Sequence, residues 1–167
     1  IIFDRIEAGT YMIAALLTNG KVKIKNINLN IMSVVIKLLK SMGSKILKRK
    51  NYVVVSGSKN LKSSIVKTNP YPGFPTDLQA QLMVLMTKAK GISKIKESIF
   101  ENRFMHVSEL RRMGAQINIK GNEATIFGIN KLNGAELMAT DLRASVSLVL
   151  AGLSANNRTI VNRVYHL

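Results

Sequence analysis

An internal repeat constrains the fold of this chain more than any other feature of the sequence. Three stretches begin with an aspartate, continue as an apolar helix-like run and return as a β-rich run; their first residues are Asp4, Asp77 and Asp141. In the first two copies a second helix-like run ends on a Met-Gly pair, Met42-Gly43 and Met113-Gly114. Repeats of this kind are supersecondary units that bury their apolar faces by packing against one another.

Each copy is predicted to have the order β-α-β-α-β-β. A pair of strand-like runs follows each Met-Gly helix, and in the second copy Gly121-Asn122, a dipeptide typical of tight turns, joins the pair. The third copy has its aspartate helix and its first return strand but no Met-Gly helix and no closing strand pair, so we expect it to be truncated. Within one domain over 1–167, we place the units at about residues 1–57, 62–129 and 134–167.

The two kinds of helix differ in their hydrophobic pattern. The aspartate-led runs 82–86 and 146–151 are apolar on nearly every face, which is typical of helices buried all round. The Met-Gly helices are amphipathic, with Val107, Leu110 and Met113 on one face and polar residues between them. We therefore expect an α/β fold (α+β in some schemes) with helices in the middle and sheets outside, the reverse of a TIM barrel.

Composition excludes several classes of protein. Hydrophobic residues make up 47% of the chain, which excludes intrinsic disorder. The absence of cysteine excludes a disulfide scaffold, a thiolate zinc site and a cysteine nucleophile within this chain, and the two histidines argue against a histidine-rich metal site. The longest apolar run, 144–153, is about half as long as a membrane span.

The chain is strongly basic, with a formal net charge of +16 and its densest cluster at Lys45, Lys48, Arg49 and Lys50. Such a balance is typical of proteins that bind nucleic acids. However, Tyr52 is the only aromatic residue beside the cluster, and the chain is also rich in Ile and Asn, which like Lys have AT-rich codons. We favour compositional drift of the genome as the cause of the charge and keep a basic module that binds an anionic ligand or RNA as the alternative.

The starts of the predicted helices are the candidate chemical sites. Thr76-Asp77 and Thr140-Asp141 each look like an N-cap threonine followed by a first-turn acid, a pattern that can also serve the helix dipole alone. The loop 69–75 before Asp77 holds all three prolines of the chain and is expected to be rigid. If the buried helices run parallel, their N-termini converge at one end of the domain and form an anion site.

The stretch 101–106 lies between a return strand and a surface helix. Its Arg103 suits either a ligand carboxylate or phosphate, or a structural ion pair with a helix-start aspartate. We expect His106 to cap or flank its helix rather than to act in catalysis. No glycine-rich phosphate loop occurs in the sequence.

Four segments of the chain stand out together: DRIEAGTYMIAAL (4–16), PGFPTDLQAQ (72–81), ENRFMHVSELRRMGA (101–115) and ATDLRASVSLVLAGL (139–153). They resemble the UDP-N-acetylglucosamine 1-carboxyvinyltransferase family of enolpyruvyl transferases. The segments are long and follow the family's order, so the resemblance is specific and covers essentially the whole chain.

The resemblance implies two domains, each an inside-out α/β barrel of three such units around buried parallel helices, with this chain as most of one domain. The implied reaction transfers an enolpyruvyl group from phosphoenolpyruvate to the 3-hydroxyl of UDP-N-acetylglucosamine and releases phosphate through a tetrahedral intermediate. This cytoplasmic reaction commits the sugar nucleotide to peptidoglycan, and hence to cell-wall biogenesis, cell shape and division, and it needs no metal or organic cofactor. The implied partners are the two substrates and the enzyme's other domain, with neither nucleic acid nor a membrane.

The resemblance also assigns roles to individual residues. Asp77 matches the aspartate that contacts the sugar 3-hydroxyl and serves as general base, and Asp141 matches a second active-site aspartate near the reacting centre. Ile99 matches an apolar position whose main chain contacts the nucleotide sugar, while Arg103 and Arg143 match arginines that line the cleft. The family's cysteine-bearing loop, its Lys-Asn pair for phosphoenolpyruvate and a phosphate-binding arginine have no counterpart in the chain, so we expect half of the cleft to be absent.

Overall fold

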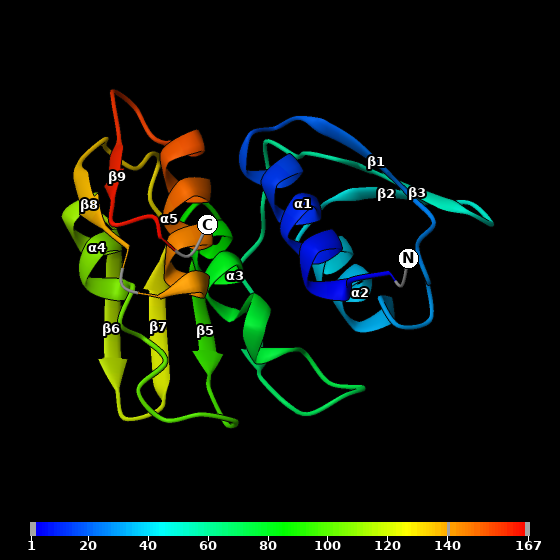
Figure 1. Cartoon of the computed structure of the whole chain (residues 1–167), viewed down its shortest axis with the longest axis horizontal. Coiled ribbons are helices and arrows are strands. Elements are labelled where there is room, and N and C mark those ends of the chain that lie inside the picture. The colour runs from blue at the N-terminus through cyan, green and yellow to red at the C-terminus, as the bar shows by residue number, and fades with distance from the viewer. Residues whose placement is uncertain (1–2, 140, 166–167) are drawn as a thin grey trace.

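A computed structural model describes residues 3–139 and 141–165 of the chain (Figure 1). The first repeat unit contains α1 (Arg5–Leu17), β1 (Lys21–Lys25), α2 (Ser33–Ser41), β2 (Lys45–Lys48) and β3 (Tyr52–Ser56). The second contains β4 (Ile65–Lys67), the 3₁₀ turn η1 (Thr76–Leu78), α3 (Gln79–Thr87), β5 (Ile92–Lys96), α4 (Val107–Arg112), β6 (Gln116–Lys120) and β7 (Glu123–Phe127). The third contains β8 (Glu136–Met138), α5 (Leu142–Ser154) and β9 (Ile160–Asn162).

The strands form separate sheets, which in the described part of the chain have the orders β1-β3-β2, β4-β5-β7-β6 and β8-β9. In the second and third sheets the leading strand lies parallel to the strand after the central helix, with Ile65 opposite Lys94 and Glu136 opposite Ile160. Parallel pairing requires a crossover, which α3 and α5 supply. The predicted β-α-β-α-β-β order is therefore complete in the second unit, while the first unit starts at α1 and the third has the order β-α-β among the described residues.

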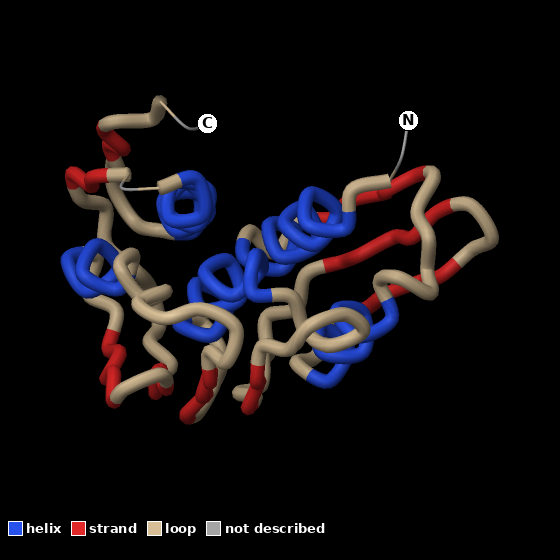
Figure 2. The backbone as a smooth tube through the Cα atoms, turned by 60° about the horizontal axis from the view of Figure 1, so that its bottom comes forward, coloured by secondary structure: helices blue, strands red, loops and turns tan. Residues whose placement is uncertain are grey.

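Three helices, α1, α3 and α5, form the centre of the molecule. They contact one another, and Figure 1 shows them side by side with strands to either side. Figure 2 shows from a second direction that the strands lie toward the periphery. Every residue of α3 is buried, as its lack of a polar face predicts. The predicted arrangement, with central helices and outer sheets in an α/β fold, is confirmed.

The central helices run in the same direction. In the first turn of α3, the Gln81 amide donates to the hydroxyl of Thr10, in the middle of α1, over 3.3 Å. Near the end of both helices, the Lys88 ammonium donates to the carbonyl of Leu17 over 2.9 Å. Both contacts join residues 71 positions apart, so α1 and α3 pack in parallel and in register with the repeat.

Equivalent backbone hydrogen bonds occur in the first two units. The Gly57 amide donates to the carbonyl of Gly20 over 2.8 Å, and the Gly128 amide donates to the carbonyl of Gly91 over 3.0 Å. Each residue of the second bond follows its counterpart in the first by the same 71 positions. Glycine is required at the closing position because a Cβ atom on Gly128 would lie 1.9 Å from the Ala89 carbonyl oxygen.

The surface helices match their predicted pattern, since Val107, Leu110 and Met113 are all buried. No helix in the described part of the chain is long and apolar enough to cross a membrane. The helix α5 differs from α3 in keeping an apolar flank in solvent, where Leu142, with 52% of its surface exposed, and Leu153, with 62%, lie on one face. The amphipathic helix α4 contacts α5 but leaves these two leucines in solvent.

We predict that this flank causes the chain to self-associate. Leu153→Lys should lower the concentration-dependent light scattering at low salt, because it removes exposed apolar surface from α5 without touching the core. Leu47→Lys is the matched control. Leu47 lies in β2 with 47% of its surface exposed, and its replacement changes the net charge by the same amount. An equal effect of both variants, or of neither, would show that the α5 flank is not the contact.

Candidate active site

Asp77 lies at the end of the molecule where the central helices begin. It is the middle residue of η1, which leads directly into α3. The preceding loop is closed by the Asn69 amide, which donates to the carbonyl of Phe74 over 3.0 Å. The first turn of α5 reaches the same place through Arg143. The predicted convergence of helix starts is therefore confirmed for α3 and α5.

Two arginines hold one oxygen of the Asp77 carboxylate. Arg143 Nε donates to Oδ1 over 2.5 Å, and Arg103 Nη1 donates to the same oxygen over 3.2 Å. No donor among residues 3–139 and 141–165 reaches Oδ2, which leaves this oxygen free to accept a hydrogen bond from a ligand. The Asp77 side chain is 37% exposed, so a ligand in solvent can approach it.

Opposing effects set the ionisation of Asp77. Partial burial raises the pKa of its carboxyl, while hydrogen bonds from Arg143 and Arg103, together with their positive charges, lower it. The arginines outweigh the burial, and the pKa of Asp77 lies below its ordinary value. In this state the carboxylate is ionised at neutral pH but is a weak base.

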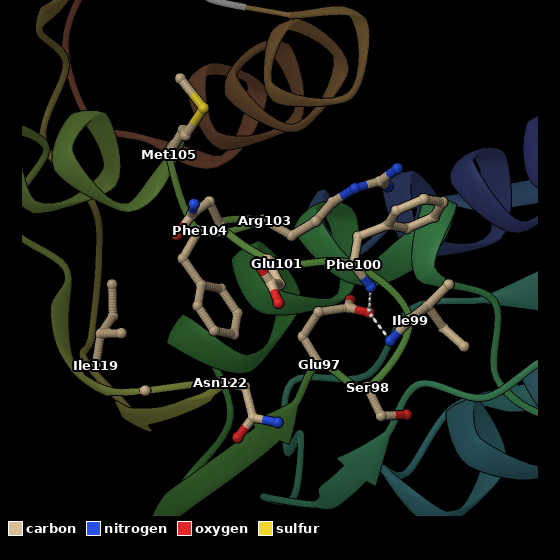
Figure 3. A pocket seen from close by; sticks show the side chains of 12 residues that line it. Glu97, Ser98, Ile99, Phe100, Glu101, Arg103, Phe104, Met105, Ile119 and Asn122 are labelled. Atoms are coloured by element: carbon tan, nitrogen blue, oxygen red, sulfur yellow. Dashed lines mark hydrogen bonds between the residues drawn. The ribbon is translucent and has the colours of Figure 1, made fainter.

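The loop after β5 carries the other predicted residues and is anchored by a buried carboxylate. Glu97 is only 2% exposed, and its Oε1 accepts hydrogen bonds from the amides of Ile99, over 2.8 Å, and Phe100, over 3.3 Å (Figure 3). The Arg103 guanidinium lies over the Phe100 ring, 4.4 Å from its centroid. The loop thereby places Ile99 and Arg103 on the same side of the molecule as Asp77.

A pocket of about 870 Å³ opens next to the loop that carries Arg103. It is lined by loop residues 97–105 and, across from them, by Ile119, Gly121 and Asn122 of the β6–β7 hairpin (Figure 3). Ile99 and Arg103 both belong to the lining, and Arg103 also contacts Asp77. Arg103 therefore connects the wall of the pocket to the carboxylate that has a free oxygen.

Asp141 serves as the N-cap of α5. Its Oδ1 accepts from the amide of Arg143 over 2.9 Å and from that of Ala144 over 3.0 Å. The cap fixes the first turn from which the Arg143 side chain reaches Asp77. The structure thus brings Asp77, Arg103 and Arg143 into contact and connects Asp141 to them through Arg143.

Comparison with known proteins identifies the family of the chain. The family model described as EPSP synthase (3-phosphoshikimate 1-carboxyvinyltransferase) matches residues 1–167. The chain belongs to the EPSP synthase family. A solved structure of that fold, the enolpyruvyl transferase NikO from Streptomyces tendae, matches with a TM-score of 0.91 and 27% identity, covering 100% of this chain and 40% of that one.

Curated relatives of this EPSP synthase family member are named UDP-N-acetylglucosamine 1-carboxyvinyltransferase, as the four segments indicated. The protein of Pelagibacter ubique is 62% identical over 164 residues, which are 98% of this chain and 39% of the relative. The protein of Geotalea daltonii is 57% identical over 164 residues, with the same coverage. The chain therefore spans about 40% of the length of the curated relatives it matches.

One prediction about the helix starts of this EPSP synthase family member is wrong. Thr76 is not an N-cap: the residue before η1 is Pro75, and the Thr76 hydroxyl instead donates to Glu97 over 2.9 Å. Thr140, the other predicted cap, lies outside the described residues, and Asp141 itself caps α5. Glu97 was not predicted at all, because nothing in the sequence other than its place at the end of a strand marks it.

His106 stands at the N-cap position of α4, but its side chain accepts no capping hydrogen bond, so it flanks the helix, and it is 3% exposed. Burial lowers the pKa of its imidazole from 6.5 to about 4, against a smaller opposite effect of Asp141. The unfolded chain therefore binds this proton at a higher pH than the folded chain. Stability that is present above pH 6.5 should be lost as the pH falls toward 4.

We expect this loss to amount to about 3 kcal/mol at most. Urea unfolding at pH 7 and near pH 4.5 measures it, and His106→Gln should reduce the difference between the two pH values. If the variant loses as much stability as the parent across this window, another group is responsible.

Proposed function

We propose that this chain forms the sugar-nucleotide side of the active site of a UDP-N-acetylglucosamine 1-carboxyvinyltransferase. The observation that carries the proposal is Asp77, with one oxygen held by Arg103 and Arg143 and the other open; Arg103 in turn lines a pocket of about 870 Å³. The 62% identity to the Pelagibacter ubique relative supports the choice of substrate.

In the proposed reaction Asp77 is the general base. The sugar 3-hydroxyl must lose its proton as its oxygen bonds to the enolpyruvyl carbon, whose C=C bond opens while the methylene carbon gains a proton; the adduct then loses phosphate and one methyl proton, which restores the double bond. A carboxylate within hydrogen-bond reach can accept the hydroxyl proton. The open Oδ2 suits this role because Oδ1 is already occupied by two donors. The two arginines fix the orientation of the carboxylate but also weaken it as a base.

The second substrate can remove that weakness. Phosphoenolpyruvate carries a phosphate and a carboxylate, and an anion that binds to Arg103 and Arg143 competes with Asp77 for their charges. Loss of the arginine hydrogen bonds leaves partial burial as the main influence, which raises the pKa of Asp77. The base would then gain strength only when both reactants are present.

The remaining residues fit supporting roles in this proposal. Ile99 lines the pocket, and its main-chain carbonyl is proposed to contact the nucleotide sugar, since its amide already donates to Glu97. Asp141 caps α5 and so sets the position of Arg143 next to the reacting centre. The substrates, the cytoplasmic place of the reaction, its role in cell-wall synthesis and the contribution of a second domain are all part of the proposal, and the name of the relatives supports the sugar-nucleotide substrate among them.

We predict that Asp77→Asn lowers kcat by about 10²–10⁴-fold, because asparagine keeps the size of the side chain but cannot accept the proton. The test uses the Pelagibacter ubique relative with this chain in place of its matching 164 residues, and it measures phosphate release and UDP-N-acetylglucosamine affinity. The affinity should change little.

Asp4→Asn is the matched control. Asp4 is the counterpart of Asp77 in the first unit, but its side chain caps α1 by accepting from the amides of Ile6 and Glu7, which asparagine can also do. The control should keep the parent kcat. If Asp77→Asn stays within about threefold of the parent, Asp77 is only a helix-start residue and the proposed role is lost.

One observation favours a second function, the binding of a polyanion such as RNA. No Asp or Glu occurs between Glu7 and Asp77, and β1 exposes Lys21, Lys23 and Lys25 on its outer face. Micromolar RNA affinity that falls steeply with salt and is lost on Lys23→Glu would support this function. Weak binding that Lys23→Glu leaves unchanged would show a merely basic surface.

A further inference from the structure

Glu97 is the most buried carboxylate near the site, and the proposed reaction does not use it. It is 2% exposed at the end of β5, and no cation pairs with it among residues 3–139 and 141–165. Burial of an ionised carboxylate is costly unless hydrogen bonds replace its hydration. Four donors do so: the hydroxyls of Thr68 and Thr76, over 2.8 and 2.9 Å, and the amides of Ile99 and Phe100.

These donors belong to the segments that supply the site. Thr76 directly precedes Asp77 in η1, and the amides of Ile99 and Phe100 begin the loop that carries Arg103. One buried carboxylate therefore connects the backbone on either side of the ion pair between Asp77 and Arg103.

The Thr76 hydroxyl links Glu97 to Arg103. A hydroxyl has one proton, and Thr76 donates it to Glu97 Oε2. Its oxygen is thereby left as an acceptor for Arg103 Nη1, 3.4 Å away, and this is the nitrogen that donates to Asp77 Oδ1. The direction of the first hydrogen bond thus permits the second.

We propose that Glu97 is a positioning residue, which holds the Arg103 guanidinium against Asp77 through the Thr76 hydroxyl and through the main chain of Ile99 and Phe100. This proposal rests on the proposed function only in taking Asp77 to be the important carboxylate. The alternative is a purely structural role, in which Glu97 only holds the ends of β4 and β5 together through its hydrogen bond with Thr68, which follows β4. The two differ in whether the ionisation of Asp77 depends on Glu97.

Glu97→Gln separates them. Glutamine keeps the shape, but its amide nitrogen donates where a carboxylate oxygen accepted, so the Thr76 proton must turn away from residue 97 and compete with Arg103. A displaced Arg103 stabilises the Asp77 carboxylate less, and the pKa of Asp77 should rise. The probe is the side-chain carboxyl carbon of Asp77, followed by NMR during a pH titration of the whole 167-residue chain without substrate.

Arg103→Gln sets the scale, because it removes the cation itself. Glu97→Gln should raise the pKa of Asp77 by at least half as much as Arg103→Gln does. In the double variant Glu97→Gln should add nothing further, because its effect passes through Arg103. Glu109→Gln is the matched control: the Glu109 side chain is 12% exposed, accepts from the Met138 amide and should leave the pKa of Asp77 unchanged.

An unchanged pKa of Asp77 in Glu97→Gln, or an equal rise with and without Arg103, overturns the proposal. Should Glu97→Gln fail to fold, Thr76→Val decides, since it removes the linking hydroxyl and leaves Glu97 its other three donors. A rise in the pKa of Asp77 in Thr76→Val supports the proposal, and no rise overturns it. Because no substrate is used, these outcomes are independent of whether the chain acts on UDP-N-acetylglucosamine.

Discussion

The burial of α3 on all sides is the constraint on which the rest of the structure depends. A helix with no exposed residue needs neighbours around its whole circumference, and α1, α5 and the strands β5 and β7 supply them. Each large side chain that α3 buries contributes about 1.5–3 kcal/mol. The partly exposed ion pairs of Asp77 contribute about 1 kcal/mol or less each, so apolar packing fixes the scaffold and the charges serve the site.

Parallel packing of the central helices explains why the site lies where it does. Because α3 and α5 run in the same direction, η1 and the first turn of α5 lie next to each other, and Asp77 meets Arg143 across the gap between them. The Arg103 loop reaches the same point from the end of β5. Three segments far apart in sequence thus supply one carboxylate and two cations, and no one of them contains the site alone.

The sequence predicts those parts of the structure that have a period. The repeat, the buried and amphipathic helices and the Gly121-Asn122 turn all follow from local pattern, and the pairing of Arg103 with a helix-start aspartate was one of two options its place suggested. Glu97 could not be predicted in the same way, since its hydroxyl donors lie 29 and 21 residues away and no spacing encodes them. Thr76 was misassigned for the same reason: its partner is Glu97 and not the backbone of its own helix.

The paired backbone hydrogen bonds of Gly57 with Gly20 and of Gly128 with Gly91 bear on how such a chain can change its length. A gene rearrangement that adds or removes 71 codons between these points joins the end of one unit to the matching end of another. The junction keeps its hydrogen bond and its glycine, so the number of units can change without a new loop. Divergence of the core limits this exchange, because α1 and α3 present different side chains and each is shaped to its own neighbours.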